Sequence, residues 1–113
     1  MTKLKKNKII FKDDYVGILL NHKTYGRAIA KIDVEDLPKV ENIKWGLLVN
    51  KKTYTIYVVN NHKGVITYLH RIITNCPDDL IVSHINHDTL DNRKQNLKLK
   101  EVSNNFYFSR RSA

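Results

Sequence analysis

A polar loop between two short apolar runs holds the residues with the clearest chemical potential in this chain. The runs are Ile81-Val82 and Leu97-Leu99. Between them stand one histidine and a series of turn-forming residues, namely His84, Asn86, Asp88, Asp91, Asn92, Arg93 and Asn96. Asn and Asp side chains bond to nearby backbone, so the loop is expected to be ordered although it is long. An imidazole exchanges its proton near pH 7, which suits acid–base chemistry.

The segments on either side of this loop indicate how it is held. In the second run Leu97 and Leu99 alternate with Lys98 and Lys100, which predicts a half-buried strand with a basic outer side. Beyond it, Val102 and Phe106 recur at helical spacing, with Asn105 beside Phe106. The local order is therefore predicted to be strand, ordered loop, strand and helix.

This segment resembles the HNH endonucleases, and most closely the homing enzymes of phages and introns. The resemblance covers residues 66–106 and rests on several spaced matches. They are Tyr68-Leu69-His70-Arg71, Val82-Ser83-His84-Ile85-Asn86, Asp91-Asn92-Arg93-Lys94-Gln95-Asn96-Leu97, and Asn105 nine positions after Asn96. The resemblance implies an α+β fold, with β-rich hairpins and a short helix followed by a C-terminal ββα-metal (His-Me finger) motif.

The resemblance also implies a function and roles for individual residues. The activity would be metal-dependent hydrolysis of DNA phosphodiester bonds, by nicking or cleavage, on double-stranded DNA. His84 would be the general base, and Asn92 would hold the loop and orient His84. Asn105 would be a ligand of one divalent cation, Mg²⁺ or Mn²⁺, and Ser83 occupies the other ligand position. Structural zinc is not expected, because Cys76 is the only cysteine.

Ser83 departs from the family pattern, which has a metal-binding Asp at this position. Mg²⁺ prefers anionic oxygen ligands, and a neutral hydroxyl is a poor substitute. The chain is then a natural enzyme of reduced activity, a natural descendant that has lost cleavage, or an altered form. The alternative function is accordingly a cleavage-deficient HNH-derived protein that binds nucleic acid, or inhibits or regulates a nuclease, with a possible protein partner.

The charge of the chain favours a polyanionic partner. Twenty Lys and Arg face eleven Asp and Glu, which gives a formal charge of +9. Much of the positive charge lies on and after the polar loop, where a phosphate backbone would have to come. The residues predicted to contact DNA are Arg71, Arg93, Lys94, Lys98, Lys100, Arg110 and Arg111. For Arg71, a surface salt bridge is an equal alternative.

The remainder of the chain predicts a β-rich scaffold. Residues 9–32 read as strands around a turn at 21–24, and residues 45–49 and 54–59 read as a hairpin. A short helix capped by Asp33 or Glu35 is predicted to run through Leu37 and Val40 and to end before Trp45, and a second is predicted at 69–75. We therefore divide the chain into a β-rich portion, residues 1–65, and an HNH portion, residues 66–113, which together form one compact domain.

Three aromatic residues, Trp45, Tyr54 and Tyr57, stand among lysines in the predicted hairpin. Such residues can stack on bases of single-stranded nucleic acid. Packing in the core or across strands is the favoured interpretation, because aromatic residues in amphipathic strands usually serve that purpose.

The sequence also indicates where the protein acts. No apolar run approaches the roughly 18 residues of a membrane-spanning helix. The basic N-terminus is interrupted by Asp13 and Asp14 before a signal-peptide core could form. We expect an intracellular protein, acting in the cytoplasm of a bacterial host and not secreted.

Overall fold

The computed structural model describes residues 6–101. Along the chain the elements are β1 (Ile9–Phe11), β2 (Val16–His22), β3 (Gly26–Ile32), a 3₁₀ turn (Val34–Asp36), α1 (Leu37–Val40), β4 (Gly46–Asn50), β5 (Thr55–His62), β6 (Val65–Tyr68), α2 (Leu69–Thr74), β7 (Leu80–His84), a second 3₁₀ turn (Lys94–Asn96) and β8 (Leu97–Glu101).

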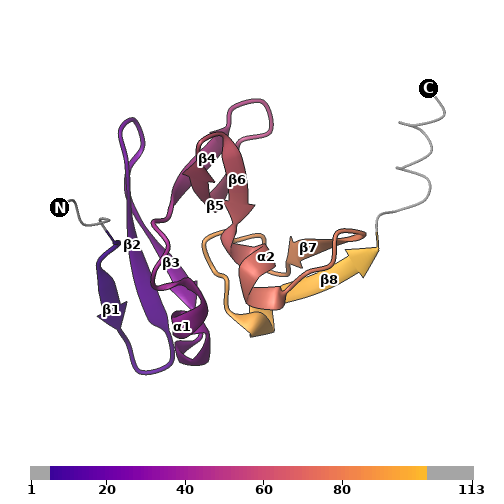
Figure 1. The fold of residues 1–113 in the computed structure, drawn as a ribbon, viewed down its shortest axis with the longest axis horizontal. Coiled ribbons are helices and arrows are strands. Elements are labelled where there is room, and N and C mark those ends of the chain that lie inside the picture. The colour runs from indigo at the N-terminus through magenta and orange to yellow at the C-terminus, as the bar shows by residue number, and fades with distance from the viewer. Residues whose placement is uncertain (1–5, 102–113) are drawn as a thin grey trace.

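The strands form three small antiparallel sheets, each built from neighbours in the sequence. Their orders are β1-β2-β3, β4-β5-β6 and β7-β8 (Figure 1). Two of the tight turns use glycine in the left-handed region, with φ of +86° at both Gly26 and Gly64. Only glycine adopts this conformation without steric cost, so these positions fix where the strands reverse.

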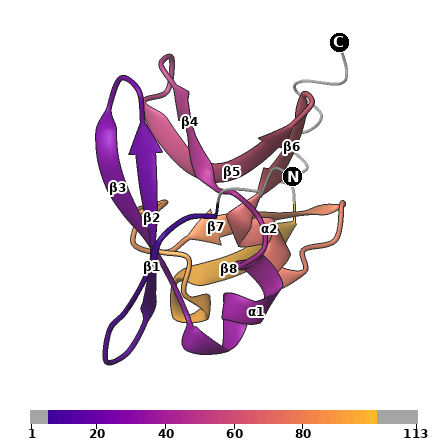
Figure 2. The same ribbon diagram turned by 60° about the vertical axis from the view of Figure 1, so that its left-hand side comes forward.

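The core lies where the first two sheets meet the short helices. On β2 the buried residues Val16, Ile18 and Leu20 follow the two-residue period of a strand with one face inward. They pack with residues of the other elements, including Trp45, Val58, Leu69 and Ile73. Figure 2 shows α1 and α2 below the β4–β6 sheet and beside the β7–β8 hairpin. The β7–β8 hairpin therefore contacts the core through α2.

Both α-helices are short because residues that start or stop a helix lie close together in the sequence. Pro38 lies in the first turn of α1, where its missing N–H costs nothing. In α2 the C-cap residue Asn75 takes a left-handed conformation with φ of 52°, and Pro77 follows two residues later. These signals allow α2 fewer than two turns, so it leads directly from β6 to β7.

The prediction of an α+β fold with a C-terminal ββα-metal arrangement is wrong. Of the described residues, 47% lie in strands and 17% in helices, and the helical residues are divided among single short turns. Strands prevail because β-branched and aromatic residues recur at alternate positions, and because turn residues interrupt every helical stretch early. The helix predicted around Val102 and Phe106 lies outside the described residues.

Among residues 6–101, no helix is long and apolar enough to cross a membrane.

Candidate functional site

The β7–β8 hairpin brings His84 to the mouth of the polar loop. His84 is the last residue of β7 and pairs with Leu97, the first residue of β8, while Ser83 pairs with Lys98. From Leu80 to His84 the hairpin is a regular antiparallel ladder, and after His84 the chain enters the loop of residues 85–96. The backbone of His84 is therefore fixed by a strand, whereas its side chain faces residues of the loop.

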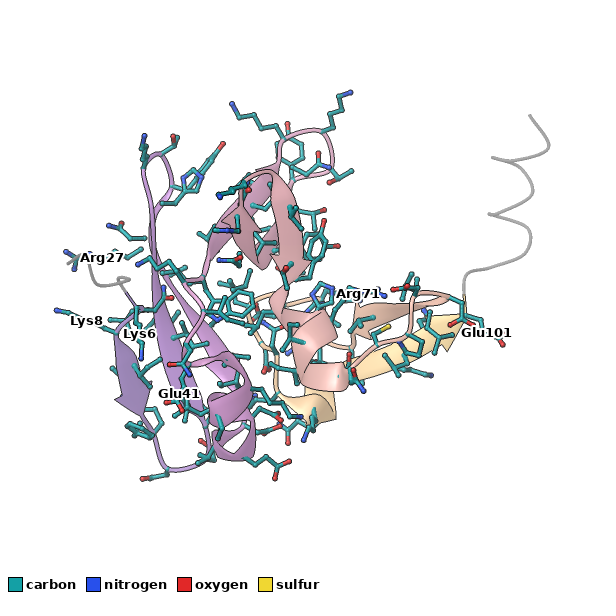
Figure 3. The ribbon with its side chains drawn as sticks, viewed as in Figure 1. Lys6, Lys8, Arg27, Glu41, Arg71 and Glu101 are labelled. Carbon is teal, nitrogen blue, oxygen red and sulfur yellow. The ribbon has the colours of Figure 1, made fainter. Side chains whose placement is uncertain are left out.

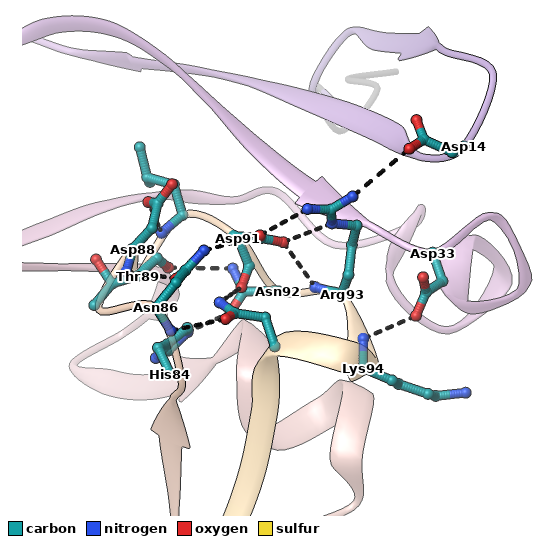
Figure 4. A network of polar contacts seen from close by, with 12 residues as sticks. Asp14, Asp33, His84, Asn86, Asp88, Thr89, Asp91, Asn92, Arg93 and Lys94 are labelled. Atoms are coloured by element: carbon teal, nitrogen blue, oxygen red, sulfur yellow. Dashed lines mark hydrogen bonds and ion pairs between the residues drawn. The ribbon is translucent and has the colours of Figure 1, made fainter.

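A hydrogen bond between His84 and Asn92 fixes the tautomer of the imidazole. Nε2 of His84 lies 2.8 Å from Oδ1 of Asn92, and Nδ2 of Asn92 donates to the carbonyl of Thr89 at 3.3 Å (Figure 4). The second bond orients the amide so that its oxygen faces the ring. An amide oxygen can only accept, so Nε2 carries the ring proton and Nδ1 keeps its lone pair. Nδ1 has no hydrogen-bond partner among residues 6–101.

Asparagine and aspartate side chains hold the loop in one conformation, as the sequence predicted. Asn96 accepts the N–H of Asn86 at 2.9 Å and donates to the carbonyl of Asp91 at 2.9 Å. Asp88 accepts the N–H of Leu90 at 3.0 Å. Asn92 and Asn96 are buried, so these bonds replace those that water would make. The loop is consequently a rigid support for His84.

A second set of contacts fixes the loop through Arg93. Its guanidinium makes a bidentate pair with Asp91, with Nε 2.8 Å from Oδ1 and Nη2 2.9 Å from Oδ2. It also lies 3.9 Å from Asp14 (Figure 4). On another side it lies over the ring of Tyr15. The bond from Arg93 holds the pKa of the buried Asp91 carboxyl below its ordinary value, and that of Arg93 is raised in return.

The loop is also attached to the N-terminal sheet, far away in the sequence. The backbone of Lys31 on β3 donates to Leu90 at 2.8 Å and accepts from Asn92 at 2.8 Å. Lys94 donates its backbone N–H to Asp33 and its ammonium to Glu35, at 2.9 Å and 2.7 Å. Asn92, which orients His84, is therefore held by β3 through its backbone and by the β7–β8 hairpin through its bond to His84.

An aromatic cluster packs against the other side of His84. Its members are Tyr57 on β5, Tyr68 on β6, His70 on α2 and His84, with ring centroids 5.3–6.5 Å apart. The rings of His70 and His84 meet edge to face at 5.3 Å. Burial lowers the pKa of His70 to about 4, with the nearby charges of His84 and Arg71 acting in the same direction. His70 is thus a neutral packing residue at pH 7.

A surface hollow of about 550 Å³ opens beside Ser83 and His84. It is lined by residues 54–57, 81–84 and 87–90 together with Lys100. A hollow of this size is within the range that accepts small ligands or one part of a larger one. It is the place where a substrate would meet His84.

The residues predicted to contact DNA differ in whether their charged groups already have partners within the protein. Arg71, which belongs to α2, donates to the carbonyls of Pro77 and Leu80 and lies beside β7 (Figure 3). Arg93 is bound to Asp91, and Lys94 to Glu35 and Asp36. In contrast, Lys98 and Lys100 are exposed on β8, and Lys100 lines the hollow. Arg110, Arg111 and Asn105 lie outside the described residues.

The described residues do not form a set of ligands for a divalent cation beside His84. Around the hollow they offer one carboxylate, Asp88, and the hydroxyl of Ser83, together with neutral groups and the cationic Lys100. A hard cation such as Mg²⁺ prefers several oxygen ligands, including carboxylates. Ser83 lines the hollow at the predicted position but brings no negative charge to it.

One acidic group elsewhere has the spacing of a metal site, but two lysines already pair with it. Ligand atoms of Asp33, Glu35 and Asp36 lie within 4.8 Å of one another. Asp36 is fully buried, and its Oδ1 lies 3.1 Å from the ammonium nitrogens of both Lys39 and Lys94. These are ion pairs without the alignment of hydrogen bonds. We regard this group as the anchor of Lys94, and thus of the loop.

Tyr57 lies at the site although the sequence had favoured core or cross-strand packing for it. One signal was available for Tyr57, because a two-residue turn at Lys63-Gly64 fixes the β5–β6 register. That register pairs His62 with Val65, and its extension sets position 57 opposite position 70. His70 is buried and packs in the ring cluster.

Comparisons of this chain with protein-family models, with curated proteins and with solved structures gave no match. The function of the chain is therefore inferred from the geometry of the site and from the resemblance of its motifs.

Proposed function

We propose that this protein binds DNA at the hollow beside His84 and hydrolyses its phosphodiester bonds as an endonuclease of the HNH type. One observation carries the proposal, namely the bond from His84 Nε2 to Asn92 Oδ1. It leaves Nδ1 as the ring nitrogen that can take a proton. A general base must be oriented before it acts, and this bond orients His84 and fixes its tautomer.

The reaction would begin with a water held in the hollow. His84 Nδ1 removes a proton from this water, the hydroxide attacks the phosphorus of the DNA backbone, and the bond from phosphorus to the 3′ oxygen breaks. The departing 3′ oxygen takes up a proton from solvent water. The imidazolium that forms keeps its Nε2–H on the amide oxygen of Asn92, which stabilises the positive charge. Lys98 and Lys100 attract the phosphate backbone to this surface. We place this activity in a bacterial cytoplasm, in a protein derived from a phage or mobile element.

A second candidate function is DNA binding without cleavage, and one observation favours it. Ser83 stands where the family has a carboxylate, and the described residues around the hollow do not compensate for the missing charge. The same basic strand would then hold DNA, or a protein bound to DNA, while the histidine remains as a relic.

A plasmid-nicking assay separates the two functions. Supercoiled plasmid is incubated with the protein and Mg²⁺ or Mn²⁺, the cations that HNH enzymes use. The endonuclease proposal expects nicked circles from the natural chain and none from His84→Ala. The matched control is His62→Ala on β5, an exposed histidine away from the hollow, which should cut like the natural chain.

The other outcomes have distinct meanings. Cleavage by Ser83→Asp alone would assign the natural chain to the second function, with a site one carboxylate short of activity. Retention of DNA in a salt-sensitive manner without cleavage by either protein would also favour the second function. Failure to retain DNA at low salt would overturn both.

A further inference from the structure

Tyr54 is an exposed aromatic residue held in a strained backbone conformation at the rim of the hollow. Its side chain is 89% exposed, and its φ is 56°, in the left-handed region. A bulky residue is disfavoured there, and glycine or asparagine would be the usual choice. The ring therefore gains nothing from burial in the free protein, while its backbone carries a steric cost.

The other non-glycine residues with positive φ place this observation in context. Among residues 6–101 they are Lys63, Asn75 and His87. Lys63 belongs to a two-residue hairpin turn and Asn75 caps α2, so both are ordinary positions. His87, with φ of 66°, lines the same hollow as Tyr54. Strained backbone at surface positions is concentrated where ligands bind, and here it borders the hollow from two segments of the chain.

The turn that carries Tyr54 is ordered and basic. Asn50 Oδ1 accepts the N–H groups of Lys52 and Thr53 at 3.0 Å and 3.3 Å, which fixes the turn. Lys51 and Lys52 are exposed beside it. An exposed aromatic ring with positive charge beside it can bind a nucleotide, because the charge attracts the phosphate and the flat ring stacks on the base.

The structure also separates Tyr54 from the other two aromatic residues of this hairpin. Trp45 is buried, and its Nε1 donates to the carbonyl of Val40 at 3.0 Å. Tyr57 belongs to the ring cluster around His84. The packing interpretation is thus confirmed for Trp45 and Tyr57 and is wrong for Tyr54, which is left free to contact a partner.

We propose that the hollow binds an unpaired nucleotide, with its base stacked on Tyr54 and its phosphate drawn by Lys51, Lys52 and Lys100. This inference rests on the proposed function, to which it adds a substrate class. The DNA recognised at His84 contains an unpaired base, in a single strand or in a bulged or opened duplex. A perfectly paired duplex hides the faces of its bases within the stack, so it cannot use Tyr54 in this way.

Fluorescence anisotropy with labelled oligonucleotides tests the proposal on the full chain. The probes are a single strand, the same strand in a perfect duplex, and a duplex with one bulged base. Tyr54→Gly should weaken binding of the single strand and of the bulged duplex about tenfold, because it removes one stacked base. Binding of the perfect duplex should not change, and Tyr54→Phe should bind like the natural chain because it keeps the ring.

Two controls make the result specific. Tyr25→Ala removes a half-exposed tyrosine from the β2–β3 turn, outside the hollow, and should leave binding unchanged. In urea unfolding, Tyr54→Gly should have a midpoint equal to or above that of the natural chain, since glycine relieves the left-handed strain. A lower midpoint would mean that the ring serves stability, and this would overturn the proposal.

The remaining outcomes distinguish this proposal from the function on which it rests. If DNA is bound but Tyr54→Gly has no effect, or weakens the perfect duplex equally, this proposal alone fails. If Tyr25→Ala weakens binding as much as Tyr54→Gly, the hollow is not the nucleotide site. If the natural chain binds none of the three probes at low salt, the proposed function fails as well.

Discussion

His84 works between two neighbours that act on its ring in different ways. On the loop side, Asn92 binds Nε2 and selects the tautomer. On the core side, His70 packs its ring edge to face against that of His84. A charged His70 would repel a charged His84, so the site requires the inner histidine to be neutral. Burial supplies this condition, since an imidazolium inside the ring cluster would be poorly solvated.

The buried state of His70 predicts how stability depends on pH. Its pKa falls from 6.5 in the unfolded chain to about 4 in the folded protein, so the unfolded chain binds the proton more tightly. The folded state should therefore lose about 2 kcal/mol of unfolding free energy between pH 7 and pH 5 from this residue. In His70→Phe this loss should be absent, as measured by urea unfolding at both pH values. An equal loss in both proteins would contradict the assignment.

At the scale of elements, the loop of residues 85–96 behaves as a structural unit although its one helical element is a single 3₁₀ turn (Lys94–Asn96). Its own asparagines close it, and Asp91 joins it to Arg93 through a bidentate pair. Backbone bonds to Lys31 attach it to β3. A segment with this many fixed polar contacts can keep a catalytic side chain in place as well as a helix can.

Replacing Asp91 by Asn should loosen this unit. The variant loses a charged acceptor for Arg93, so its unfolding free energy at pH 7 should drop by about 2 kcal/mol. Because the pKa of Asp91 is lowered in the folded protein, its contribution is complete above the ordinary carboxyl pKa. It is then lost as the pH falls through the lowered value. The deficit of Asp91→Asn should thus shrink in urea unfolding below about pH 4.

Asp88→Asn is the matched control for this prediction. Asp88 is exposed, and an asparagine oxygen can still accept the N–H of Leu90. This variant should unfold like the natural chain at pH 7. A deficit for Asp91→Asn that persists unchanged in acid would show that the charge of Asp91 is not what stabilises the loop.

On the scale of the whole molecule, single polar residues join the small sheets. Asn7, which precedes β1, donates to the carbonyls of Leu19 and Trp45 at 2.9 Å each. It also accepts the N–H of Trp45 at 2.7 Å. It therefore connects the first sheet with the start of the second. The loop that holds His84 is attached to the first sheet, and Tyr57 and Tyr68 of the ring cluster belong to the second, so the surroundings of His84 depend on how these two sheets are placed.

Asn7→Ala should destabilise the whole protein. The three hydrogen bonds are lost, and the N–H of Trp45 is left beside a buried side chain without its acceptor. We expect a decrease in unfolding free energy of about 2–4 kcal/mol in urea unfolding. Asn42→Ala, which removes an exposed bond to Lys6, should cost less than about 0.5 kcal/mol. Equal effects of the two substitutions would show that Asn7 does not join the sheets.

Much of the local structure could be predicted from the sequence. The hairpins, the short helices around Leu37 and Leu69, and the order of the polar loop were all expected, and the structure confirms them. The fold class was predicted wrongly. The resemblance to the HNH family implied a C-terminal helical motif, whereas the many short strands indicated a mostly β structure. Turn residues and strand periodicity act within a few positions, so one sequence is sufficient to recognise them.

The tertiary structure decided what the side chains of the site do. Lys94 was expected to meet DNA, yet its ammonium binds Glu35, 59 positions away. Tyr54 was expected to pack and is exposed, whereas His70 and His84, from separate elements, have their rings in contact. The sequence determined which chemical groups are available and how each short segment bends. Which groups meet, and which remain free for a partner, depends on contacts between distant segments that exist only after the sheets have packed.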